Sequence, residues 1–147
     1  MAAIIKSPDV GELRALMAVF AEAFEDAPTY AGAPPSTAYL SERLRDPAFI
    51  ALVAIADGRV AGGLTAYELR KPEQERTELY IFELAVAAQH RRQGIATRLI
   101  EALKAKARQG GCQVIFVQAD HDDPPAIALY ERLGRRSAVL HFDLYVE

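Results

Sequence analysis

The chain has 147 residues, 51% of them apolar, and a formal net charge of −3 at pH 7. This length and apolar fraction are typical of one domain with a substantial core, here residues 1–147. The slightly acidic balance gives no reason to expect nucleic acid or an anionic membrane as partner. The single cysteine, Cys112, excludes an intrachain disulfide framework. Because residues 1–20 lack a signal-peptide pattern and no apolar run has membrane-spanning length, we expect a cytoplasmic protein.

The first third of the chain predicts a short strand and two helices. Residues 2–6 fit an edge strand. A helix is expected to start either at Ser7, with Pro8 at the first helical position, or at Asp9, with Glu12 three residues later as a capping box. Its buried face is expected to hold Val10, Leu13, Met17, Phe20 and Phe24. The proline- and glycine-rich residues 25–35 predict a loop, and a serine-capped helix is expected over residues 36–45.

A hairpin follows in the sequence. Residues 49–56 are apolar, and Asp57-Gly58 is a dipeptide typical of a two-residue hairpin turn. Residues 60–69 form the expected return strand, in which Gly62-Gly63 indicates a bulge or a close backbone approach. Residues 70–76 are highly charged and predict a loop.

The next segments are a strand and a long helix. Tyr80–Val86 is nearly continuously apolar, as in strands covered on both faces, and Glu83 is its only charged residue. Apolar residues then recur at helical spacing from about residue 95, and Gly110 stands where a helix commonly ends.

The last third predicts a strand over 113–119 and a helix over about 125–133, capped by Asp123. Residues 137–146 alternate between apolar and polar side chains, which predicts a half-buried strand. The element order β-α-α-β-β-β-α-β-α-β predicts an α/β (α+β) protein with a mixed sheet.

The turn between the strand ending at Val86 and the long helix predicts an anion site. A helix N-terminus offers unpaired N–H groups and the positive end of the helix dipole. Gly94 lets a ligand approach the backbone closely, and Arg91, Arg92 and Arg98 add positive charge. We expect a diphosphate here. The turn lacks both the P-loop pattern and the three glycines of a dinucleotide fingerprint.

The pattern Arg91-x-x-Gly94-x-Ala96 after an apolar strand resembles the coenzyme A pyrophosphate loop of the GNAT superfamily of N-acetyltransferases; a surface basic turn is the alternative. The resemblance implies acetyl-coenzyme A as cofactor and a mixed central sheet of about six to seven strands. Helices would cover both faces, and two parallel strands would splay apart around the acyl arm. The cofactor-binding residues it implies are Leu84, Ala85, Val86, Arg91, Arg92, Gln93, Gly94, Ile95, Ala96, Thr97, Ala126 and Tyr130.

Acetyl transfer to an amine requires a base, a polarised carbonyl and an exit for the thiolate. Glu83 lies on the central strand and is our candidate base; the alternative is a structural carboxylate paired with a basic group. Backbone N–H groups near Val86 are expected to polarise the carbonyl. Tyr130 lies in a segment that resembles the family's Ala-x-x-x-Tyr-x-x-x-Gly. This resemblance implies that its hydroxyl protonates the coenzyme sulfur; a core tyrosine is the alternative.

Acidic residues predict a cationic acceptor. In the expected fold they surround the acyl site, where charge-assisted hydrogen bonds would hold a polycation. Helix capping and solvation are the alternative explanation. The proposed substrate-binding residues are Glu25, Asp26, Tyr30, Asp120, His121, Asp122, Asp123 and Asp143. The three histidines have no metal-ligand spacing, so no metal is expected, and no GxSxG elbow indicates a hydrolase.

Longer segments resemble the aminoglycoside 3-N-acetyltransferases of type I. They are residues 78–86 with 90–97, 117–120, and the closing His141-Phe142-Asp143. The resemblance implies transfer to the 3-amino group of a gentamicin-like aminoglycoside, antibiotic resistance, and a possible homodimer with the C-terminal strand at its interface.

Two departures from that family concern the acceptor side. Residues 121–125 replace the family's Tyr-Gly-Asp-Asp-Pro, and Glu83 stands where an aspartate is common. They leave the range of aminoglycosides open. The alternatives are a GNAT enzyme for another polyamine or a protein amine, and a non-catalytic acyl-coenzyme A-binding module.

Overall fold

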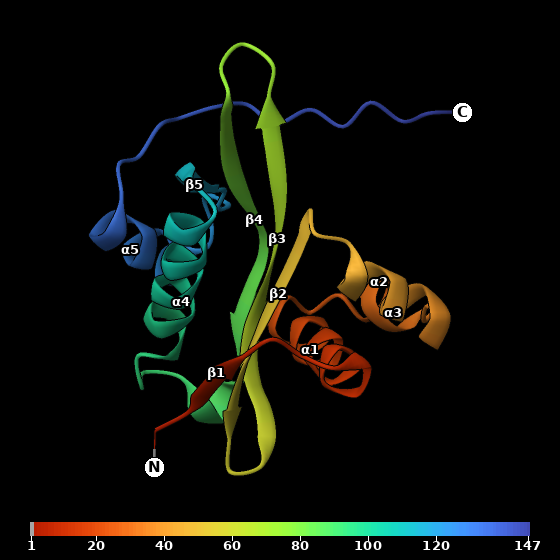
Figure 1. Ribbon diagram of the computed structural model, residues 1–147. Helices are drawn as coiled ribbons and strands as arrows, with labels where there is room; N and C mark the ends of the chain where they lie inside the picture. The colour runs from red at the N-terminus through yellow and green to blue at the C-terminus, as the bar shows by residue number, and fades with distance from the viewer. Residues whose placement is uncertain (1) are drawn as a thin grey trace.

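The computed structural model describes residues 2–147 as a five-stranded sheet between two helical layers (Figure 1). The strands are β1 (Ile4–Lys6), β2 (Phe49–Ala56), β3 (Arg59–Lys71), β4 (Arg76–Val86) and β5 (Cys112–Val117). The helices are α1 (Val10–Ala23), α2 (Ala27–Ala31), α3 (Thr37–Arg45), α4 (Ile95–Gln109) and α5 (Pro124–Leu133), with a short 3-10 turn η1 (Ala88–His90). No helix in residues 2–147 is both long and apolar enough to span a membrane.

The sheet is mixed, as the sequence predicts. Its strands lie in chain order, with antiparallel pairing from β1 to β4 and a parallel pairing of β4 with β5. A parallel pair needs a crossover, which α4 supplies. One core lies between the sheet and α4, with Leu99 and Leu103 fully buried; a second lies between the sheet and α1, around Leu16 and Phe20. In Figure 1 α4 and α5 lie on one side of the sheet, and α1, α2 and α3 on the other.

The N-terminal helices differ in detail from the prediction. The capping box of Asp9 and Glu12 is confirmed, since each side chain meets the other's backbone N–H. On α1, however, Leu16 is fully buried, whereas Phe24 is 41% exposed and lies beyond the helix. The expected loop 25–35 contains α2, which is capped by the Asp26 side chain.

Gly62 and Gly63 confirm the close backbone approach. A Cβ on Gly63 would lie 2.5 Å from the Leu52 carbonyl oxygen and 2.7 Å from Leu16, and one on Gly62 would lie 2.6 Å from the Ala85 carbonyl oxygen. The bulge is also present, where the β2–β3 register shifts after Ala54. The glycines therefore let β3 fit between two strands and under α1.

We expect Gly63→Ala to lower the free energy of unfolding by about 1–3 kcal/mol, because overpacking forces backbone atoms apart. The measurement is equilibrium unfolding in urea. Gly110→Ala is the matched control, since the nearest atom to a Cβ there is 3.6 Å away and φ is −90°. Equal stability of the two variants would contradict this account of the packing.

The C-terminal segment contradicts the prediction. Residues 135–147 form no strand, and every one of them is exposed. The sheet therefore has five strands, not six or seven. Figure 1 shows this segment leaving α5 and crossing the molecule to the side of α1 and α2. Its alternating pattern is therefore not matched by a half-buried position in the described structure.

Candidate functional site

The two parallel strands diverge at one end. The last residues that pair across β4 and β5 are Ile81 and Val117, and β4 continues to Val86 beyond them. The N–H of Ala87 donates to the carbonyl of Ala61 on the β3 side at 2.7 Å. Since N–H direction alternates along a strand, the N–H groups of Leu84 and Val86 face the open side. The gap thus presents backbone hydrogen-bond donors at the end of β4, near Val86.

The N-terminus of α4 forms an anion-binding turn beside this gap. Arg92 has φ 63° and Gly94 has φ 77°, so successive N–H groups turn toward one side, as in anion-binding nests. No side chain in the described part of the chain caps α4, and a Cβ on Gly94 would have no atom within 4 Å. Uncapped N–H groups with open space before them suit a diphosphate, so the residues fit the implied coenzyme A.

Arg91 connects the turn to the strand. Its Nε donates to the Val86 carbonyl at 3.0 Å, while the side chain stays exposed. Because one edge of the guanidinium holds the end of β4, its terminal N–H groups remain available to a phosphate.

We expect Arg91→Ala to weaken acetyl-coenzyme A binding by about 1.5–3 kcal/mol, as for one lost charge-assisted hydrogen bond. Isothermal titration calorimetry measures this directly. Arg108→Ala removes an equal charge from the last turn of α4 and should leave the affinity unchanged. A loss of affinity equal to that of Arg91→Ala would show that only net charge matters.

Glu83 lies half-buried on β4, held by two hydroxyl groups. Thr65 Oγ1 donates to Glu83 Oε1, and Tyr30 Oη donates to Glu83 Oε2, both at 2.5 Å. Thr65 lies opposite Glu83 on β3 and is 2% exposed, while Tyr30 belongs to α2. Burial, and then the bond to Glu83, raise the pKa of Tyr30, so its hydroxyl keeps its proton and donates. The two hydrogen bonds therefore fix the orientation of the Glu83 carboxylate. Its partners are hydroxyl groups, not the basic group of the alternative interpretation.

Tyr130 projects from α5 and is half-buried against the core on the α4 side. Burial, aided by the charge of Asp123, raises its pKa to about 12. Its phenol is therefore protonated throughout the neutral range.

The acidic residues proposed to bind the acceptor differ in their structural roles. Asp26 and Asp123 each cap a helix, through Oδ1 bonds to the N–H groups of Thr29 and Ala126. Capping is thus confirmed for two of the acids, each of which keeps its second carboxylate oxygen for another donor. The other proposed acceptor residues of this group are exposed on loops, namely Glu25, Asp120, His121 and Asp122. Asp143 lies on the C-terminal segment, where the Nε2 atom of His141 lies 2.9 Å from its Oδ1 atom.

The structure adds a row of aromatic side chains that sequence reasoning missed. It crosses four strands on the face shared with Glu83, and it consists of Phe49, Tyr67, Phe82, Tyr80 and Phe116. β4 has a bulge within this row, because Thr65 pairs with Glu83 and Ala66 with Ile81, which leaves Phe82 as the extra residue. Phe82 is 59% exposed and Tyr67 41%.

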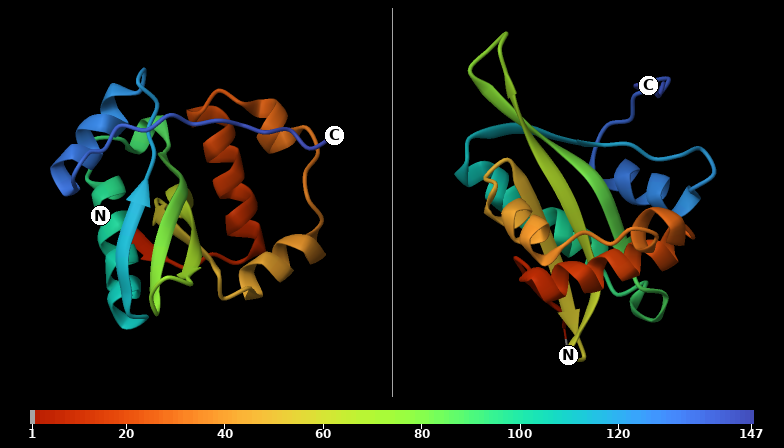
Figure 2. Two further views of the ribbon diagram at one scale, coloured as in Figure 1. Left: turned by 90° about the horizontal axis from the view of Figure 1, so that it is seen from above. Right: turned by 90° about the vertical axis from the view of Figure 1, so that its right-hand side faces the viewer.

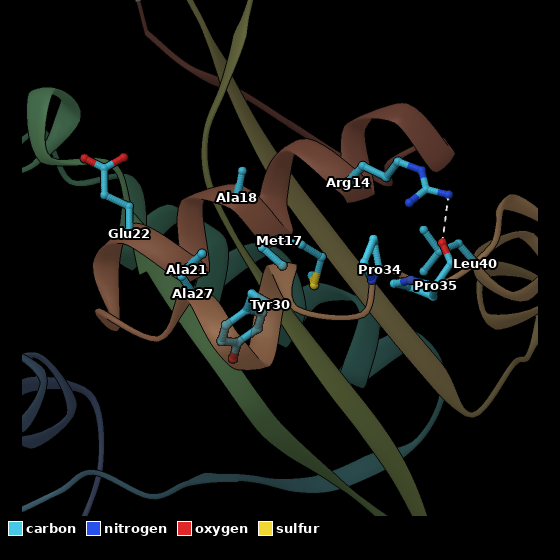
Figure 3. Close-up of a pocket in the computed structure, with 11 residues that line it drawn as sticks. Arg14, Met17, Ala18, Ala21, Glu22, Ala27, Tyr30, Pro34, Pro35 and Leu40 are labelled. Carbon is cyan, nitrogen blue, oxygen red and sulfur yellow. Dashed lines mark hydrogen bonds between the residues drawn. The ribbon is translucent and has the colours of Figure 1, made fainter.

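A cavity of about 450 Å³ lies on the outer side of α1, α2 and α3 (Figure 3). Its lining is mostly apolar, with Arg14 and Glu22 as the charged members, and Arg14 donates to the Pro35 carbonyl at 2.9 Å. Tyr30 of α2 lines it and also donates to Glu83, so the cavity and the carboxylate share this side chain. Neither Glu83 nor the α4 N-terminus lines it. Residues 2–147 also contain no cluster of three or more metal-ligating side chains.

The family model described as "Acetyltransferase (GNAT) family" matches residues 14–134. The chain belongs to the GNAT family of acetyltransferases. Acetyl-coenzyme A is the donor that this family uses, and the uncapped α4 N-terminus of the GNAT domain fits its diphosphate.

Two solved structures are similar to this GNAT domain over nearly its full length. One is an aminoglycoside acetyltransferase from an uncultured soil metagenomic sample, with 50% identity, a TM-score of 0.96 and 100% of both chains covered. Another aminoglycoside acetyltransferase from such a sample, in complex with sisomicin, has 28% identity and a TM-score of 0.91, with 99% of this chain and 97% of that one covered.

Curated relatives share a shorter region. N-acetyltransferase family 8 member 2 of Rattus norvegicus is 34% identical over 82 residues, which are 56% of this chain and 36% of that protein. GCN5-related N-acetyltransferase 4, chloroplastic, of Arabidopsis thaliana is 37% identical over 105 residues, 66% of this chain and 36% of that protein. The chain thus spans about a third of the length of these relatives.

Proposed function

We propose that this protein transfers the acetyl group of acetyl-coenzyme A directly to an amine of an aminoglycoside, and that it thereby confers resistance to the antibiotic. The 3-amino group of a 2-deoxystreptamine ring is the proposed position. Glu83 accepts the proton of the attacking amine. Tyr130, the expected general acid, assists the departing thiolate chiefly by donating a hydrogen bond from its hydroxyl to the sulfur. The residues of the α4 turn hold the diphosphate, and the thioester bond supplies the activated acetyl group.

The observation that carries this proposal is the position of the Glu83 carboxylate. It is fixed by Tyr30 and Thr65 on the strand whose N–H groups face the gap between β4 and β5. A base must lie within hydrogen-bond reach of the amine as it meets the thioester. The 50% identity to an aminoglycoside acetyltransferase over the full chain supports the acceptor class.

The surroundings of Glu83 suit a polycationic sugar. The exposed faces of Phe82 and Tyr67 can contact an ammonium group or the apolar side of a sugar ring. The exposed acids at residues 120–122 and the free oxygen of Asp26 supply opposite charge. Together they favour an acceptor with several amines over one with a single amine.

The test is a thiol-release assay with acetyl-coenzyme A and a panel of aminoglycosides, spermidine and peptides. We expect turnover of gentamicin-like compounds and, by NMR of the product, acetylation at the 3-amino group. Turnover of spermidine or peptides alone would favour the second candidate, a GNAT enzyme for other amines, to which the curated N-acetyltransferase relatives point. Coenzyme binding with no amine acetylated would indicate a non-catalytic module.

A further inference from the structure

Tyr67 is a member of the aromatic row that offers a free polar group. Its ring lies between those of Phe49 and Phe82, with centroid distances of 5.5 Å and 6.0 Å. Within residues 2–147 the Tyr67 hydroxyl makes no hydrogen bond, whereas the hydroxyls of Tyr30 and Tyr80 do. The right-hand view of Figure 2 shows β3 and β4 continuing past α1 to the hairpin that joins them. Tyr67, which is 41% exposed, therefore presents an aromatic face and an unused hydroxyl to a ligand.

Helix α3 places a cation near this hydroxyl. The helix packs against β2, the strand next to β3. The guanidinium carbon of Arg43 lies 5.7 Å from the ring centroid of Tyr39, which supports it from below. Burial raises the pKa of Tyr67; the charge of Glu83 and the neighbouring Tyr39 phenol raise it further, whereas the charge of Arg43 lowers it. The Tyr67 hydroxyl is thus within electrostatic reach of Glu83 on one side and of Arg43 on the other.

Arg43 is held in place but keeps a donor for a ligand. Its Nη1 donates to Asp46 Oδ2 at 3.2 Å, and Asp46 Oδ1 accepts from the N–H of Ala48 at 2.9 Å. In the part of the chain that the structure describes, Nη2 of Arg43 makes no hydrogen bond, and only its Nε is buried without a partner. Each oxygen of Asp46 therefore has a donor, while Nη2 of Arg43 remains free to donate.

These groups suit a hydroxylated sugar ring. An aromatic face can pack on the apolar side of the ring, a phenol hydroxyl can donate or accept, and a guanidinium donates to sugar oxygens. An ammonium group fits poorly beside Arg43, because the guanidinium accepts no hydrogen bond and repels a second cation. The opposite holds at Glu83 and at the exposed Asp120 and Asp122, whose carboxylates accept from an ammonium. The two sides of Glu83 thus differ in the groups that they favour.

We propose that Tyr67 and Arg43 form a second acceptor subsite, which takes a hydroxyl-rich sugar ring while the ring that carries the reacting amine lies at Glu83. This subsite rests on the proposed function, because the acceptor that it orients is an aminoglycoside. The 6.0 Å between the centroids of Phe82 and Tyr67 is a step comparable to the separation of two linked sugar rings. The acceptor is therefore bound in one direction, with its amines toward the acids and its hydroxyls toward α3.

Two acceptors that differ by one group test this preference. Neamine and paromamine are two-ring aminoglycosides in which one carbon of the sugar ring bears an amine or a hydroxyl, respectively. The measured quantity is kcat/KM for paromamine divided by kcat/KM for neamine. Arg43→Gln should lower this ratio by about fivefold, the effect of one charge pair in contact in water. Arg43→Lys keeps the charge and should keep the ratio. Arg45→Gln removes a charge from the same turn of α3, and the ratio should not change.

Tyr67→Phe tests the hydroxyl separately from the ring. It should raise KM for both acceptors by about three- to tenfold, as for one lost hydrogen bond, and leave kcat within about twofold of wild type. A loss confined to kcat would place Tyr67 in the chemistry and not in this subsite. Calorimetric titration with acetyl-coenzyme A should give the wild-type affinity for every variant, which shows that the fold is intact.

The possible failures are distinguishable. Acetylation of both compounds with an unshifted ratio in Arg43→Gln, or a wild-type KM in Tyr67→Phe, would reject the subsite alone. A change in the mass of Tyr67→Ser by light scattering, with KM unaltered, would show that the row packs against protein, and the subsite would be wrong. If wild type acetylated neither compound, the proposed function would fail and the subsite with it.

Discussion

Glu83→Gln is expected to lower turnover by about 10²–10⁴-fold, the usual contribution of a general base. Glutamine keeps the size of the side chain but cannot take a proton from the amine. It also replaces one carboxylate oxygen by an N–H₂ donor, which would face the hydroxyl of Tyr30 or Thr65. The measurement is kcat in the thiol-release assay over a range of pH. The acid limb of the wild-type profile should flatten in the variant, because protonation of this base no longer limits the rate.

Coenzyme binding separates this chemical effect from damage to the fold. Glu83 is not part of the α4 turn. The affinity for acetyl-coenzyme A should therefore stay within about twofold of wild type, because sites that share no partners act independently. Tyr30→Phe and Thr65→Val each remove one hydroxyl donor and should cost about tenfold in turnover. Wild-type kinetics in Glu83→Gln would exclude Glu83 as the base.

Local patterns predicted most of the frame of the site. The capping box of Asp9 and Glu12, the hairpin at Asp57-Gly58 and the helix end at Gly110 are set by neighbours in the sequence, and the structure has each of them. The α4 turn follows the same logic, since a glycine with φ 77° and an uncapped helix are local features. Glu83 is a candidate from the sequence because it is the one charged residue in the apolar run Tyr80–Val86.

The environment of Glu83 was not predictable in the same way. Its contact with Tyr30 joins residues 53 positions apart, and it depends on a short helix in a segment whose composition predicts a loop. The Phe82 bulge depends on register between two strands, which no local pattern fixes. The segment 137–146 was predicted as a strand by its alternation, but alternation specifies a half-buried environment and not which chain supplies it.

Tyr130→Phe is expected to lower turnover by about 10- to 100-fold, which corresponds to one hydrogen bond to a developing negative charge. The pKa of about 12 explains why the loss should be smaller than for Glu83. A thiol has a pKa of about 8.5, so complete proton transfer from this phenol to the thiolate is unfavourable. The hydroxyl then acts chiefly by donating a hydrogen bond to sulfur as the C–S bond breaks. Because the pKa is raised, this donor is lost only in strongly alkaline solution, not near neutrality.

A merely structural role for Tyr130 predicts a different result. If its hydroxyl stabilises the leaving group, the variant should regain part of its rate with acetyl-seleno-coenzyme A, since a selenolate leaves with less assistance. Removal of a packing contact would slow both donors equally. Tyr39→Phe, on the exposed face of α3, is the matched control and should behave as wild type with each donor. Equal losses with the thioester and the selenoester would assign Tyr130 to the core, and the acid would have to be sought elsewhere along the gap between β4 and β5.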